Sequence, residues 1–493
     1  MSTSTGLEVR ARRGLLWSLL SNTTLRLGTL LTGIVLARIL APEDFGVYAV
    51  ALTIQTVLMT MSELGLAADL VRHGDIEHRG PTIASLSLAA SGALTALMFS
   101  AARPLATALG ASDAAPVIQV MSVTLLLAGI GVVPYSRLQR GLAQRTLFVI
   151  DLVSFVVATG ITVALALHDW GPMSLAIGRV AAQVLATFLQ FLLSGERPRY
   201  GWDQKVAASG LRFGVPLASA GLLSWILLSL DYVIIGRLSG PTMLGFYVLA
   251  FNISSWPTTV IGSALKAVAM PTFAQRSDRT GSPDVEGLRT SSALTWAVAV
   301  PIAVALATLA EPLIAAVYGS RWLPAAEALA GLAAFGALRV VFDLWIAYLT
   351  AAGRAPTLVW TQVAWIVTLG PLMALAVAQR GLQGAGLVHA VVAALIMLPL
   401  YLFGLGRCGV PIPPIARQFV PPLVAAVPAG VAGWFAGGIP GGPWLQLVLG
   451  GVVVVVVYIA ALWPWLRRDP AIAPRLRRLR RTPHVDHDSE GES

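Results

Sequence analysis

Of the ionisable side chains inside long apolar stretches of this chain, seven are candidates for chemistry: Arg26, Arg179, Arg339, Glu63, Asp231, Glu311 and Asp343. A charge at membrane depth is costly unless it faces protein or water, so such residues are candidates for function. A guanidinium can grip a phosphate through parallel hydrogen bonds, which makes the arginines candidate anion-binding residues. The carboxylates are candidate counter-charges or ion-coupling groups.

The local sequence separates these candidates. Arg26 has Asn22 one turn behind it and no carboxylate within helical reach, which makes it the best anion-binding candidate. Arg339 and Asp343 share a helix face, so a structural pair remains an alternative for them, as does a partner on a neighbouring helix for Arg179. Glu311 precedes Pro312, so a structural role at a proline kink is the alternative for it.

The elements that position these residues are predicted to be membrane helices. Hydrophobic residues make up 56% of the chain and charged residues 12%, whereas soluble domains carry about 25% charged residues. A span needs about 20 mostly apolar residues. Fourteen stretches qualify: 14–37, 45–66, 82–101, 115–136, 147–167, 172–193, 210–235, 243–265, 290–318, 325–350, 357–378, 383–405, 416–436 and 444–466.

One motif occurs twice, 199 positions apart. Both copies share Arg, Pro, Gly, Tyr and Ala at the same spacing, in the pattern R-[IL]-x-[AG]-P-x-x-[FL]-G-x-Y-x-x-A. The residues concerned are Arg38, Pro42, Gly46 and Tyr48 in the first copy and Arg237, Pro241, Gly245 and Tyr247 in the second. Proline ends one helix and glycine permits close helix approach, so we predict a structural hairpin with both tyrosines near the outer headgroups.

Six predicted spans separate the two copies, which therefore enter the membrane with the same polarity. This indicates parallel repeats, an architecture of secondary transporters, and favours transport as the function. The predicted parts are a cytoplasmic N-terminal segment (1–13), an N-lobe (14–193), a cytoplasmic linker (194–209), a C-lobe (210–406), a helix pair (413–467) and a basic, disordered tail (468–493). The linker is predicted to let the lobes rock.

The distribution of positive charge predicts the orientation. Of 34 Lys and Arg residues, 26 fall on the side that carries both termini, and positive charge is retained in the cytoplasm. Both termini are therefore predicted to be cytoplasmic. The net charge of +10 is dispersed over short loops, so it indicates topology and contact with lipid, and nucleic acid is not a predicted partner.

Several kinds of chemistry find no support in the sequence. The chain lacks a G-x-x-x-x-G-K-[ST] motif, so ATP hydrolysis is not expected. Its single cysteine, Cys408, excludes an intramolecular disulfide, and its six histidines are scattered. We predict no cofactor, no metal site and no catalytic residues.

Four segments resemble the polysaccharide-flippase (Wzx-like) branch of the multidrug/oligosaccharidyl-lipid/polysaccharide exporter superfamily. They are residues 12–18 (RRGLLWS), 35–48 (VLARILAPEDFGVY), 63–68 (ELGLAA) and 213–237, which contains FGVP and LDYVIIGR. The resemblance covers roughly residues 10–410. It implies two six-helix bundles around a V-shaped cavity. Arg26 matches a first-helix arginine of the related lipid II flippases, but the position of their next arginine holds Thr32.

The resemblance also implies a function. It predicts translocation of a polyprenyl-diphosphate-linked oligosaccharide across the bacterial plasma membrane by alternating access, for O-antigen, capsule or exopolysaccharide synthesis. The cationic cavity residues would hold the diphosphate. Expected partners are membrane lipids, a polysaccharide polymerase and glycosyltransferases. The alternatives are a cation-coupled multidrug exporter of the same fold and a lipid II flippase.

Overall fold

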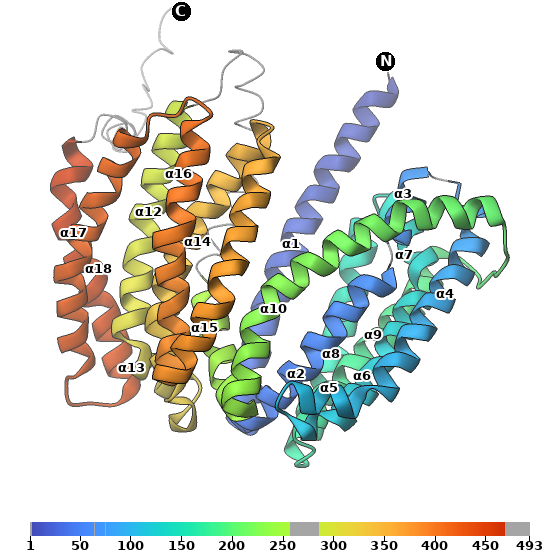
Figure 1. Cartoon of the computed structure of the whole chain (residues 1–493), viewed down its shortest axis with the longest axis horizontal. Coiled ribbons are helices and arrows are strands. Elements are labelled where there is room, and N and C mark those ends of the chain that lie inside the picture. Colours follow the sequence, from blue (N-terminus) through green and yellow to red (C-terminus); the bar gives the residue numbers. More distant parts are fainter. Residues whose placement is uncertain (1, 64, 74, 257–284, 469–493) are drawn as a thin grey trace, which may run out of the picture. The chain divides into compact units, whose positions relative to one another are not determined.

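The computed structural model describes residues 2–63, 65–73, 75–256 and 285–468, and the elements assigned in these ranges are all helical (Figure 1). The chain divides into two compact units. Unit 1 comprises Met1–Leu249, Val317–Ala325 and Gly370–Ala385, and unit 2 comprises Ala250–Ala316, Ala326–Leu369 and Gly386–Ser493. The boundaries of the predicted lobes stay a prediction, and the predicted tail, from residue 469, lies outside the described residues.

Unit 1 is a helix bundle in which α6 packs against α2, α4 and α9, and α8 packs against α1 and α9 (Figure 1). Its helices are α1 (Ser2–Ile39), α2 (Pro42–Glu63), α3 (Leu66–His73), α4 (Ile76–Ser100), α5 (Ala102–Ala108), α6 (Ala115–Ile130), α7 (Val132–Arg140), α8 (Gln144–Leu167), α9 (Pro172–Ser194) and most of α10 (Gln204–Ser254).

Most helices of unit 2 surround an aromatic core. Trp296 stacks on Phe419 with ring centroids 5.0 Å apart, and its Nε1 donates to the Phe419 carbonyl at 3.1 Å. Trp345 Nε1 donates to Ser292 Oγ at 2.9 Å, so both buried indoles are satisfied. The helices that follow α10 along the chain are α12 (Val285–Thr308), α13 (Ala310–Val317), α14 (Ala325–Ala351), α15 (Ala355–Val392), α16 (Leu398–Gly406), α17 (Ile412–Gly437) and α18 (Pro443–Arg468). The middle of α15, Gly370–Ala385, belongs to unit 1.

Two predicted spans are each broken in the structure. The stretch 115–136 divides into α6 and α7 at Gly131, and the stretch 290–318 divides into α12 and α13 at Leu309. In both, a proline follows three residues after the break, at Pro134 and Pro312. Its ring displaces the carbonyl four residues earlier and it offers no N–H to that carbonyl, so the helix stops there.

The backbone changes direction at the proline of each motif copy. Pro42 is the first residue of α2, where its missing N–H costs nothing, and Asp44 Oδ2 accepts from Ala41 N at 2.8 Å. In the second copy α10 is interrupted by Gly240, whose φ of 82° lies outside the helical region, directly before Pro241. Residues 257–265 of the span predicted to follow lie outside the described residues.

Eleven helices of the described residues are long and apolar enough to cross a membrane. One of them, Pro356–Gly406, has 51 residues and is interrupted by non-helical backbone at Gly381, between two predicted spans. The prediction of a helical, multi-pass membrane protein is therefore confirmed. The number of fourteen spans stays a prediction.

Candidate functional site

The two copies of the motif touch each other within unit 1. A Cβ atom placed on Gly46 of α2 would overlap the carbonyl oxygen of Pro241, and one placed on Gly245 of α10 would overlap that of Pro42. Each glycine thus lies against the proline of the other copy. In Figure 1 the start of α2 lies beside the bend of α10. Any side chain at either glycine would force the backbones apart.

The two arginines of the motif make equivalent contacts. Arg38 Nε donates to the carbonyl of Val317, the last residue of α13, at 2.8 Å. Arg237 Nη1 donates to the carbonyl of Ala108, the last residue of α5, at 3.0 Å. The last carbonyls of a helix lack intrahelical donors and carry partial negative charge, so a guanidinium suits both places. Both arginines therefore hold helix ends.

Trp322 fills the space between the motif copies. It is fully buried, and its ring lies edge-on to Phe45, with centroids 5.2 Å apart, and to Phe246, at 6.0 Å. Its Nε1 donates to the carbonyl of Ala37 at 2.7 Å. The sequence did not point to this residue. Trp322 follows α13, far along the chain from both motif copies, and its local sequence has no distinctive pattern. We call these contacts, of Gly46, Gly245, Arg38, Arg237 and Trp322, the motif junction.

Asp231 has a local partner on the other side of the Gly240 break. Its side chain is buried, and Oδ2 accepts from the Tyr247 hydroxyl at 2.7 Å while Oδ1 accepts from the backbone N–H of Tyr232 at 2.9 Å. Tyr247 is 0% exposed, so its ring is enclosed by protein, and its position near the outer headgroups stays a prediction. The sequence predicted Asp231 as a counter-charge or ion-coupling group, and in the structure its carboxylate accepts a hydrogen bond from the Tyr247 hydroxyl inside the protein. Tyr48, its counterpart, is half-buried.

Two of the predicted anion-binding residues lie in unit 1. Arg26 is an exposed residue of α1, and Arg179 is an exposed residue of α9 that interacts electrostatically with Tyr48. The hydroxyl of Thr32, at the position where lipid II flippases carry a further arginine, lies 3.5 Å from the Thr159 hydroxyl of α8. That position therefore contributes to packing between α1 and α8.

The other predicted charges are spread over the remaining helices. Arg339 and Asp343 lie one turn apart on α14, both half-buried, and Glu311 is exposed in the first turn of α13. Glu63 is the last residue of α2, and its side chain lies outside the described residues. Arg339 belongs to unit 2, and its sharing a cavity with Arg26 and Arg179 stays a prediction.

Comparison with solved structures identifies the fold. The lipid II flippase MurJ in an inward closed conformation aligns with a TM-score of 0.76 over 92% of this chain and 99% of its own, at 15% identity. An inward-facing multidrug resistance MATE family transporter of the MOP superfamily aligns with a TM-score of 0.59 over 78% of this chain and 94% of its own, at 18% identity. This chain therefore shares its fold with these two proteins.

Comparison with curated sequences gives nearer relatives. The succinoglycan biosynthesis transport protein ExoT of Rhizobium meliloti is 31% identical over 392 residues, covering 79% of this chain and 78% of ExoT. The lipopolysaccharide biosynthesis protein WzxC of Escherichia coli is 24% identical over 318 residues, covering 62% of this chain and 63% of WzxC. The family of polysaccharide biosynthesis proteins matches residues 35–327, more than half of the chain. The chain therefore belongs to the polysaccharide biosynthesis protein family and is a multi-pass protein of the inner membrane.

Proposed function

We propose that this protein is a flippase that moves a polyprenyl-diphosphate-linked oligosaccharide across the inner membrane for surface polysaccharide synthesis. The observation that carries the proposal is that two arginines in the apolar helices of unit 1 are exposed. Arg26 and Arg179 are exposed, whereas Asp231 is buried and hydrogen-bonded to Tyr247. Exposed guanidiniums suit an anionic substrate, because they can bind the diphosphate bidentately.

The relatives support the same substrate class. The printed names of ExoT and WzxC refer to succinoglycan transport and lipopolysaccharide synthesis, and both polymers are assembled from sugars. A polar sugar head must cross the bilayer on a protein path, while a polyprenyl tail can remain in lipid. Translocation needs no covalent step, so we propose a transporter without an enzymatic activity of its own.

Alternating access is the proposed mechanism, with fourteen spans arranged as two parallel six-helix repeats and a final pair. The motif junction supports it, because the contacts of one copy are repeated by the other: glycine against proline, and arginine on a helix end. In the predicted orientation this junction lies on the outer side. Arg339, and the carboxylates Glu63, Glu311 and Asp343, are proposed to take part as further cavity charges.

Substrate comparison in one preparation tests the proposal. The purified protein is reconstituted into liposomes, and leaflet exchange of a polyprenyl-diphosphate-oligosaccharide is measured beside uptake of a fluorescent cationic drug. We expect exchange of the lipid and no uptake of the drug. Proton- or sodium-driven drug uptake without lipid exchange would favour the multidrug exporter. Exchange of lipid II, without exchange of other lipid-linked saccharides, would favour the lipid II flippase.

A further inference from the structure

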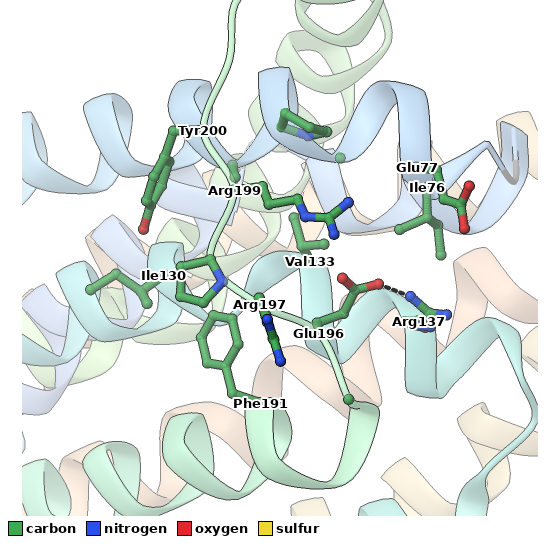
Figure 2. A pocket seen from close by; sticks show the side chains of 15 residues that line it. Ile76, Glu77, Ile130, Val133, Arg137, Phe191, Glu196, Arg197, Arg199 and Tyr200 are labelled. Carbon is green, nitrogen blue, oxygen red and sulfur yellow. Dashed lines mark hydrogen bonds and ion pairs between the residues drawn. The ribbon is translucent and has the colours of Figure 1, made fainter.

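A cavity of about 220 Å³ lies at one end of unit 1. It is enclosed by the first turns of α4, by α7, by the end of α9 and by the chain that leaves α9, and this end is predicted to be cytoplasmic (Figure 2). Five of its lining residues are charged: Glu77, Arg137, Glu196, Arg197 and Arg199. None of the functional residues proposed above belongs to it.

The charges of this cavity divide into a closed pair and two further cations. Arg137 forms an ion pair with Glu196, drawn as a dashed line in Figure 2. Among the described residues, neither Arg197 nor Arg199 has an ion-pair partner. Pro198 between them disfavours a helix and keeps Arg197 extended. Glu77 offsets one positive charge at the rim, so the cavity retains a net positive charge.

The chain that carries these arginines is fixed to unit 1 by its backbone. Gly201 N donates to the Pro81 carbonyl at 3.2 Å and to Ser85 Oγ at 3.1 Å, and Asp203 N donates to Thr82 Oγ1 at 3.0 Å. The predicted linker, 194–209, is thus docked on α4 over this stretch. A docked backbone holds both guanidiniums at the cavity at a lower entropy cost than a free loop would.

The surroundings of the cavity are those of a membrane interface. Phe188 and Leu192 are exposed on the last turns of α9, three residues before and one residue after Phe191, which lines the cavity. Tyr200 and Trp202, which follow the arginines, are exposed as well, Trp202 to 66%. Exposed apolar residues beside exposed Tyr and Trp are typical of the boundary between acyl chains and headgroups.

We propose that this cavity binds the phosphate of an anionic membrane lipid, held between Arg197 and Arg199, with the acyl chains lying along Phe188 and Leu192. A guanidinium can bind a phosphate through two parallel hydrogen bonds. The apolar surface next to the cavity favours a lipid over a soluble phosphate compound. Figure 2 shows both arginines on the same stretch of chain beside the Arg137–Glu196 pair.

Lipid binding to the purified, full-length protein tests the assignment. Binding of dioleoyl-phosphatidylglycerol in detergent is measured by native mass spectrometry for the wild type and for an Arg197→Gln/Arg199→Gln variant. Each basic residue near a headgroup contributes about 1 kcal/mol, so we expect the double substitution to weaken binding about 30-fold. The Arg197→Lys/Arg199→Lys variant keeps the charge and is expected to retain part of the affinity.

The control removes the same charge from the same end of unit 1. Lys205 and Arg212 are exposed on α10 and do not line the cavity, so Lys205→Gln/Arg212→Gln is expected to weaken binding less than about 2-fold. Equal losses in both double variants would overturn the proposal, as would undiminished binding in the first. Equal binding of dioleoylglycerol, which lacks phosphate, would overturn it too. Displacement of the lipid by millimolar inorganic phosphate would assign the cavity to a soluble anion instead.

Discussion

The reciprocal contact of Gly46 and Gly245 allows a quantitative prediction. An alanine Cβ at position 46 would overlap the Pro241 carbonyl oxygen. Overpacking costs about 1–3 kcal/mol, and a backbone neighbour cannot rotate away, so we take the upper value. Replacing a helical glycine by alanine stabilises the helix by about 1 kcal/mol, which offsets part of this cost. Gly46→Ala is therefore expected to lower the free energy of unfolding by about 2 kcal/mol, and Gly245→Ala by a similar amount.

The two substitutions should also be coupled. Once one alanine has forced the segments apart, the second enters space that is already open. We expect the double variant to lose about 2–3 kcal/mol instead of the additive ~4, which is a coupling energy of about 1–2 kcal/mol. The measurement is equilibrium unfolding in mixed micelles, followed by tryptophan fluorescence.

A glycine elsewhere in unit 1 provides the control. Gly33 of α1 has no heavy atom within 4 Å of an added Cβ, so Gly33→Ala is expected to leave the protein as stable or slightly more stable. The reasoning is refuted if Gly46→Ala behaves like Gly33→Ala. It is also refuted if the losses at positions 46 and 245 add, because independent losses mean that the two glycines do not share one contact.

Three further outcomes follow from the described contacts. Tyr247→Phe removes the donor to buried Asp231 and is expected to cost about 1–3 kcal/mol in the same unfolding assay. Trp322→Ala empties a buried indole site and is expected to cost about 3–5 kcal/mol, whereas Trp322→Phe, which keeps the aromatic packing, should cost less than half as much. Asp203 caps the start of α10: the N–H groups of Val206 and Lys205 donate to its carboxylate and lower its pKa. These hydrogen bonds are therefore intact at neutral pH and are lost as the pH falls through that lowered pKa. Hydrogen exchange of the first amides of α10 should quicken over that acidic range, and Asp203→Asn should abolish the change.

The membrane helices could be predicted from the sequence because their physical requirement is local. About 20 apolar residues suffice to satisfy a backbone in lipid, and the stretches predicted at 147–167 and 416–436 agree with α8 and α17 to within a few residues. The breaks at Gly131 and Leu309 were harder to predict. Each responsible proline lies three residues beyond its break: Pro312, which follows Glu311, was associated with a possible kink, whereas Pro134 lies inside an unbroken apolar run.

The motif was recognisable, but its tertiary contact was not. The spacing of proline and glycine predicted each hairpin, since both act on their own turn of chain. That Gly46 meets Pro241, and that Trp322 lies between the copies, depends on residues far apart in sequence. Charge alone likewise identified Asp231 without its partner, Tyr247, because the partner lies beyond the Gly240 break.

The central claim is that guanidiniums in the apolar helices carry an anionic lipid-linked sugar. Leaflet exchange of a polyprenyl-diphosphate-oligosaccharide, measured for reconstituted wild type, Arg26→Ala and Arg103→Ala, tests it most directly. Arg103 is an exposed arginine of α5, outside the predicted spans. We expect exchange to be lost in Arg26→Ala at unchanged protein level and folding, and to be retained in Arg103→Ala. Wild-type exchange by Arg26→Ala would contradict the account.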